Sequence, residues 1–123
     1  MSALLDTTIA LNLVPVIVSI DGEGNPSCPD ANVSSKNTVV YWTFDGSGAG
    51  YTFDDPAITF GTQSTDFPYP SWTQSPATVC ALFDRCHIAG QYTYSVNVVA
   101  PNGDKRRVDP VIKNGNTVGG GGG

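Results

Sequence analysis

The chain alternates between short segments of β-branched and aromatic residues and turns rich in glycine, proline, asparagine and aspartate. Such segments are typical of β-strands, because these side chains suit a pleated, half-buried sheet surface. The predicted strands are 8–20 with a bend at Pro15, 38–44, 51–53, 57–60, 78–83, 91–100 and 104–112. With no amphipathic helix of useful length, the pattern predicts an all-β fold, an immunoglobulin-like antiparallel β-sandwich of about seven strands.

The clearest local signal is a hairpin near the C-terminal end. Segment 91–100 alternates polar and apolar residues, and one face would carry Tyr92, Tyr94, Val96 and Val98. The turn is Pro101-Asn102-Gly103, where asparagine and glycine tolerate positive φ. If Asn102-Gly103 centres the turn, the numbers of paired residues sum to about 205, and Asp109 faces Val96.

Length and charge limit the organisation and the partners. The 123 residues predict a β-sandwich domain over 1–114 and a flexible glycine-rich tail over 115–123. A net charge of −5 with only six lysines and arginines argues against nucleic acid as a partner. The apolar stretch 9–20 is broken by Asn12 and Pro15, so we expect no membrane span and no cleavable signal peptide. The chain is therefore predicted to be cytoplasmic, or exported without a cleavable signal peptide.

The three cysteines, Cys28, Cys80 and Cys86, do not form an even-numbered disulfide framework. Cys80 and Cys86 either close a small loop or are reduced, buried thiols. Cys80, Cys86 and His87 place three potential metal ligands within eight positions, but no Cys-x2-Cys pair or second histidine accompanies them. We therefore predict neither a metal site nor a cofactor.

The candidate chemistry lies at the Asp109-Pro110 bond. Asp-Pro is the most acid-labile peptide link, because the aspartyl carboxyl attacks its own carbonyl carbon and the protonated proline nitrogen leaves readily. Opposite Val96, Asp109 would be desolvated and its pKa raised, so that it donates a proton to Pro110. Asp84 is the candidate for a second carboxylate that activates water. The alternative is structural, with Asp109 capping a bulge made by Pro110.

The segment Val108-Asp109-Pro110-Val111-Ile112-Lys113-Asn114-Gly115, preceded by Gly90–Val96, resembles the bacterial DP-EP family. The resemblance covers most of the chain and implies a small single-domain β-sandwich that cleaves itself after Asp109 while the cut strand stays in the sheet. It also implies self-assembly and a Lys-to-Asp isopeptide link. The chain departs from the family pattern in having Thr93 where the family lysine is expected and in lacking the Glu-Pro dipeptide.

Two function classes follow. The first is an autoprocessing domain, with Asp109 and Pro110 at the cut bond, Asp84 as the second carboxylate and copies of the chain as partners. The second is a non-catalytic structural or interaction domain that assembles or binds a partner through its sheet edges or its aromatic side chains. A carbohydrate-binding domain is a third option, since exposed aromatics stack on sugars. The aromatic candidates are Trp42, Tyr51, Tyr69 and Trp72.

Overall fold

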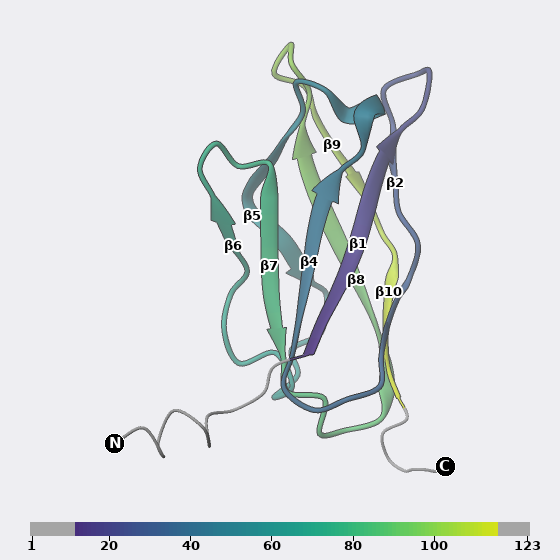
Figure 1. The fold of residues 1–123 in the computed structure, drawn as a ribbon, viewed down its shortest axis with the longest axis vertical. Helices are drawn as coiled ribbons and strands as arrows, with labels where there is room; N and C mark the ends of the chain where they lie inside the picture. Colours follow the sequence, from purple (N-terminus) through teal and green to yellow (C-terminus); the bar gives the residue numbers. More distant parts are fainter. Residues whose placement is uncertain (1–11, 116–123) are drawn as a thin grey trace.

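The computed structural model describes residues 12–115 and confirms an all-β fold built from two packed sheets (Figure 1). The strands are β1 (Asn12–Ile20), β2 (Pro26–Ser27), β3 (Ala31–Val33), β4 (Thr38–Phe44), β5 (Thr52–Phe60), β6 (Trp72–Gln74), β7 (Val79–Asp84), β8 (Gly90–Val99), β9 (Lys105–Val108) and β10 (Val111–Asn114). One 3₁₀ turn, η1 (Gly46–Gly48), follows β4.

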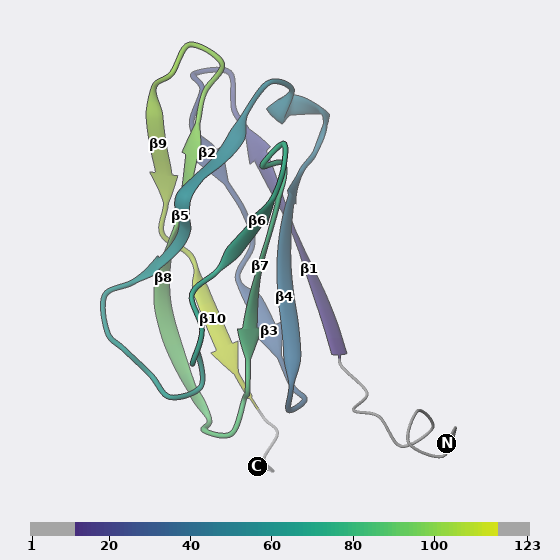
Figure 2. The same cartoon turned by 90° about the vertical axis from the view of Figure 1, so that its left-hand side faces the viewer.

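The two sheets lie face to face, as the turned view shows (Figure 2). The first sheet has the strand order β2-β1-β4-β7-β6, and the second has β3-β10-β8-β5, with β9 also pairing with β8. The prediction of a purely antiparallel sandwich is wrong in detail, because β1 runs parallel to β4 and β3 runs parallel to β10. Both sheets are therefore mixed.

The described residues form ten strands rather than about seven. The prediction for 38–44 matches β4, and 91–100 matches β8 to within one residue at each end. The predicted strands 51–53 and 57–60 are one strand, β5, whose pairing with β8 shifts between Phe53 and Ile58. The strands β2, β3 and β6 were missed because two or three residues are too short to display an alternating pattern.

The core lies between the sheets and is filled by alternate side chains of facing strands. Trp42 of β4 and Tyr94 of β8 lie at its centre, with 0% and 1% of their surface exposed. Their rings are 5.5 Å apart, and the Trp42 indole Nε1 donates a hydrogen bond of 3.1 Å to the Tyr94 hydroxyl. This contact joins the two sheets and satisfies a donor that would be costly to bury alone.

The structure also bears on the cysteines, on long apolar helices and on the C-terminal tail. Cys28, Cys80 and Cys86 are free thiols. No helix among residues 12–115 has the length and apolar character needed to cross a membrane. Of the predicted tail 115–123, only Gly115 belongs to the described residues, and its amide donates to the carbonyl of Val33 at 2.8 Å.

Replacing Tyr94 by phenylalanine tests the contact between the sheets. The substitution leaves the Trp42 indole N–H buried without this acceptor, so we expect the free energy of unfolding to fall by about 1–3 kcal/mol. Urea unfolding followed by tryptophan fluorescence measures the change. Tyr92→Phe is the matched control, because Tyr92 is only half-buried. Equal effects of the two substitutions would contradict the role given to the hydrogen bond.

Candidate functional site

The register of the C-terminal hairpin decides where Asp109 lies. Val96 pairs with Val108, and Thr93 pairs with Val111, so the numbers of paired residues sum to 204 on both sides of the Asp109-Pro110 bond. The turn is closed by a hydrogen bond of 2.8 Å from the amide of Ala100 to the carbonyl of Asp104. The register therefore differs by one residue from the predicted one.

This difference moves Asp109 to the opposite face of the sheet, and the predicted apolar surroundings are wrong. Its side chain is 47% exposed. The Ser95 hydroxyl donates a hydrogen bond of 2.7 Å to Asp109 Oδ1, and the Arg107 Nε lies 3.6 Å from the same oxygen. A one-residue slip reverses the face of every side chain in a strand, so Val96 is replaced by Ser95 as the cross-strand neighbour. The predicted burial of Asp109 is therefore absent.

The Asp109-Pro110 bond lies at the junction between β9 and β10. Pro110 is buried, and its carbonyl accepts a hydrogen bond of 3.1 Å from the amide of Tyr94, so pairing with β8 continues through the junction. The next amide, that of Val111, donates at 3.0 Å to the carboxylate of Asp30. Asp30 also lies 3.5 Å from the Lys113 ammonium. The two carboxylates that flank the bond are thus Asp109 and Asp30.

Asp30 was missed because it is 81 residues away from Val111 in sequence. It lies directly before β3, and β3 reaches β10 only through a parallel pairing between distant parts of the chain. No local spacing signals such a contact.

A shallow cavity of about 480 Å³ lies beside Asp109 on the outer face of β8. Its polar lining comes from alternate outward residues of one strand and from the loop after β5. The lining side chains other than Asp109 include Gln91, Thr93, Ser95 and Thr62. Water therefore has access to this side of the Asp109-Pro110 junction.

Asp84 lies in a separate, buried polar cluster with Asp66 and Asn114, each at most 4% exposed. The Asn114 amide Nδ2 donates to Asp84 Oδ1 at 2.9 Å and to Asp66 Oδ2 at 3.1 Å. The backbone amide of Cys86 donates to Asp84 Oδ1 at 2.8 Å. Desolvation by burial raises the pKa of Asp84 to about 6. This cluster links the end of β10 to β7 and to the loop between β5 and β6.

The structure does not bring Asp84 to the Asp109-Pro110 bond. Asp84 contacts Asn114, which is five residues beyond Asp109, or about 16 Å along an extended strand. One oxygen of Asp84 and the Oδ1 of Asn114 have no hydrogen-bond partner among the described residues. A proton on Asp84 would lower the cost of burying its carboxyl group away from water. The geometry is that of a structural carboxyl group.

The Cys and His residues do not converge. The thiol of Cys80 is buried in the core, and the thiol of Cys86 lies 3.6 Å from the carbonyl of Val33. His87 is exposed, with its Nδ1 3.1 Å from the Arg85 guanidinium. Burial raises the pKa of Cys86 to about 11 and that of Cys80 further. Residues 12–115 contain no group of three Cys, His, Asp or Glu side chains arranged to hold a metal ion.

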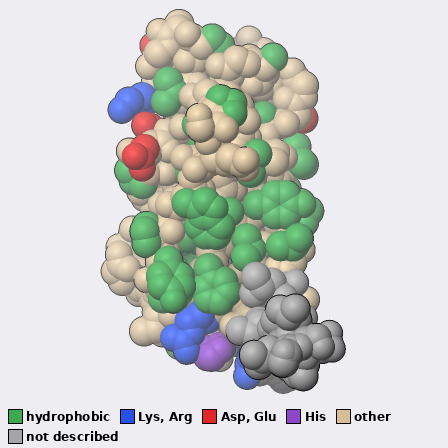
Figure 3. All heavy atoms as spheres, turned by 60° about the vertical axis from the view of Figure 1, so that its left-hand side comes forward, with side chains coloured by type: hydrophobic (Ala, Val, Ile, Leu, Met, Phe, Trp, Pro, Cys, Tyr) green, Lys and Arg blue, Asp and Glu red, His purple; other side chains and the backbone are tan. Residues whose placement is uncertain are grey.

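The first sheet has an apolar outer face as well as an apolar inner face. Strand pairing arranges its outward residues in rows across the sheet. One row is Leu13, Val39 and Phe83, and the next is Pro15, Tyr41, Ala81 and Trp72. Figure 3, which brings the β6 edge of this sheet forward and shows its outer face obliquely, shows apolar side chains gathered in the lower half of the molecule. We call these seven residues the outer apolar face.

The four aromatic residues that were candidates for binding a partner differ in their exposure to solvent. Trp42 belongs to the core, and Tyr51 is half-buried with its hydroxyl donating to the carbonyl of Gly24 at 3.2 Å. Trp72, on the outer apolar face, is 51% exposed. Tyr69 is 61% exposed, and its ring lies 6.0 Å from that of Phe83 on the same face. Only the latter two are available for a partner.

No protein-family model and no curated protein matches this chain. The resemblance to the DP-EP family stays a prediction from the residues that carry it. The function must therefore be argued from the two features described above, the Asp109-Pro110 junction and the outer apolar face.

The Asp84 cluster predicts how stability depends on pH. The folded-state pKa of about 6 lies above the ordinary value of 3.8, so the folded protein binds this proton more tightly than the unfolded chain. The contribution of Asp84 is therefore present below pH 4, is lost as the pH rises towards 6, and changes no further above it. The loss is up to about 3 kcal/mol.

Asp84→Asn should remove this dependence, because an amide keeps the acceptor and adds a donor without titrating. Urea unfolding of both proteins between pH 4.5 and pH 7.5 makes the comparison, with the exposed Asp55→Asn as control. We expect the variant to be the more stable protein at the upper end of this range. Parallel pH profiles for wild type and Asp84→Asn would show that Asp84 does not carry the effect.

Proposed function

We propose that this chain is a structural or interaction domain that binds a protein partner through the outer apolar face. The observation that carries the proposal is the exposure of this face. Leu13 is 63% exposed and Trp72 is 51% exposed, at opposite sides of a sheet whose intervening outward side chains are also apolar. Contiguous exposed apolar surface of this kind is typical of interaction sites.

The other sheet offers an internal comparison. Four of the five outward side chains of β8 are polar, namely Gln91, Thr93, Ser95 and Asn97, and the fifth is Val99. All four ion pairs found among residues 12–115 use lysines or arginines of β9 and β10. The outer face of the second sheet is therefore mostly polar, whereas the outer face of the first sheet is apolar. This difference supports a partner that covers the first sheet.

The open edge of β1 supports the same function. Its only partner on that side is the short strand β2, which pairs with Ser19 and Ile20 and leaves the rest of β1 uncovered by strand pairing among the described residues. An unpaired edge next to apolar side chains favours association with another chain. The immunoglobulin-like topology, which we inferred from the sequence pattern, stays part of this proposal.

A fluorescent dye for apolar surfaces, such as ANS, tests the outer apolar face in dilute solution, where sedimentation has first established a monomer. We expect the wild-type chain to bind the dye, and the double variant Leu13→Ser, Trp72→Ser to lose most of the fluorescence. Both side chains are exposed, so their loss should cost little stability. Ile88→Ser is the matched control, because Ile88 is 52% exposed and lies outside the face. Equal dye binding by all three proteins would exclude the face as an apolar binding surface.

A second candidate function is self-cleavage at Asp109-Pro110. The observation that favours it is the exposure of Asp109, whose side chain is 47% exposed and lines a cavity open to water, next to the buried Pro110. β10 is paired with β8 on one side and β3 on the other, so it would stay in the sheet after a cut. In place of Asp84, the second carboxylate near the bond is that of Asp30.

The chemistry uses one peptide bond and one water molecule. An Asp109 carboxylate oxygen attacks the Asp109 carbonyl carbon, the bond to the Pro110 nitrogen breaks, and this nitrogen takes a proton from solvent as it leaves. Water then opens the cyclic anhydride, which restores the Asp109 side-chain carboxyl and forms a new α-carboxyl. Asp30 would hold the Val111 amide, and with it the leaving strand, in place.

Intact mass of fresh protein, followed over days at pH 5 and pH 8, tests self-cleavage. We expect fragments that end at Asp109 and begin at Pro110, formed faster at pH 5 because the leaving nitrogen must be protonated. Asp109→Ala should abolish them, whereas Asp84→Asn should not. The control is Asp104→Ala, which removes another carboxylate of the same hairpin. A single full-length mass at both pH values would exclude self-cleavage for this chain.

A further inference from the structure

We propose that the partner of the outer apolar face is a second copy of this chain, docked face to face and antiparallel about a two-fold axis. The inference rests on the interaction function proposed above and adds the identity and orientation of the partner. A two-fold interface uses the same patch twice, so the patch must complement itself when turned by half a rotation. Apolar side chains in the middle of the face complement each other in any orientation. The charges at the ends of the face must also be complementary after the half rotation.

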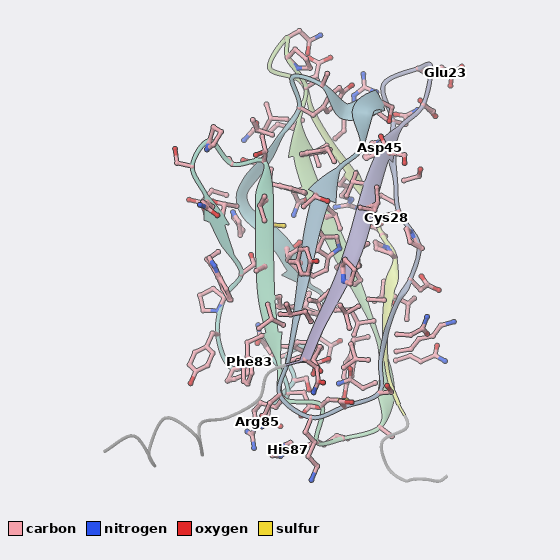
Figure 4. All side chains as sticks on the ribbon, viewed as in Figure 1. Glu23, Cys28, Asp45, Phe83, Arg85 and His87 are labelled. Atoms are coloured by element: carbon pink, nitrogen blue, oxygen red, sulfur yellow. The ribbon has the colours of Figure 1, made fainter. Side chains whose placement is uncertain are left out.

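The charges at the two ends of the first sheet are opposite. Thr38 of β4 pairs with Asp84 of β7, so Lys36 before β4 and Arg85 after β7 lie at the same end. Asp45 follows β4 at the other end, and its carboxylate accepts a hydrogen bond from Ser19 of β1. Asp21 and Glu23 follow β1 at this same end. Figure 4 shows Arg85 and His87 at the lower end of the molecule and Glu23 and Asp45 at the upper end.

None of these end charges forms an ion pair within residues 12–115, and the cation nearest the acidic end, Arg106, donates there to the carbonyl of Glu23 at 3.3 Å and pairs with Asp104. The chain has six lysines and arginines, and the four on β9 and β10 make all the ion pairs found there. The two that remain, Lys36 and Arg85, are both at the basic end of the first sheet. The Arg85 guanidinium contacts the carbonyl of Thr65 and the ring of His87, and neither is a carboxylate.

The two ends cannot neutralise each other within one molecule. β4 has seven residues and is about 24 Å long, several times the distance over which physiological salt screens exposed charges. An antiparallel second copy places the basic end of each chain against the acidic end of the other. A parallel copy would set like charges together. Charge therefore selects both the partner and its orientation.

Sedimentation equilibrium over a range of concentrations tests the dimer on the full chain. We expect the mass to rise with concentration from 12.9 kDa towards twice that value, with dye fluorescence falling as the face is covered. The double variant Leu13→Ser, Trp72→Ser should weaken the dimer about 100-fold or more, because it removes four apolar side chains from the interface. Ile88→Ser should leave the dissociation constant unchanged.

Charge exchange tests the orientation. Lys36→Glu and Glu23→Lys, each alone, should weaken the dimer about tenfold, because positions 36 and 23 of facing chains then carry like charges. An equimolar mixture of the two variants should regain the wild-type affinity. In the mixed dimer, the carboxylate introduced at position 36 of one chain meets the ammonium introduced at position 23 of the other, and the unaltered Glu23 meets the unaltered Lys36. Raising the salt concentration should reduce the difference between the variants and wild type.

The outcomes separate the two proposals. A monomer at all concentrations that still binds dye through Leu13 and Trp72 would overturn the second copy and leave the interaction face intact. A monomer that binds no dye would mean that the face is not accessible in the full chain, and would overturn both. A dimer that is indifferent to the double variant, or variants whose mixture regains no affinity, would overturn the face-to-face antiparallel arrangement.

Discussion

The alternation of side chains along paired strands is the constraint on which the rest of this structure depends. Because the period is two residues, the register of a pair decides which side chains enter the core and which face outward. The registers of β4 and β8 within their own sheets bring Trp42 to Tyr94 across the core, and the register of β8 with β9 sends Asp109 to the surface. A shift of one residue in either strand would exchange core and surface. The core and both candidate sites are consequences of the same rule.

The sequence predicts strands well where they are long and bounded by strong turn signals. The strand 38–44 matches β4, and the inward face of β8 carries Tyr92, Tyr94, Val96 and Val98 as expected. The pairing of distant segments is not readable from local pattern, which is why the parallel pairs and the contact of Asp30 with Val111 were missed. The predicted register at Asp109 was wrong by only one residue, because the hairpin turn differs from the predicted turn by one residue.

The outer apolar face had a signal in the sequence. A strand with one solvent-exposed face alternates polar and apolar residues. Two segments are instead continuously apolar, namely Leu13-Val14-Pro15-Val16-Ile17-Val18 and Val39-Val40-Tyr41-Trp42. Continuous apolar strands are typical of sheets covered on both faces. Since the second sheet covers only the inner face, the sequence itself indicates a second covering layer. It does not identify that layer, because the charges that select a second copy come together only through the strand order.

The two candidate functions occupy different sheets and do not depend on each other. Asp109 and Pro110 belong to the sheet with the polar outer face, and the outer apolar face belongs to the other. A cut after Asp109 would leave β10 held by β3, by β8 and by the hydrogen bonds from Asn114 to Asp66 and Asp84. The core contact between Trp42 and Tyr94 does not involve the Asp109-Pro110 bond. Cleavage would therefore leave the first sheet, and any partner docked on it, unchanged.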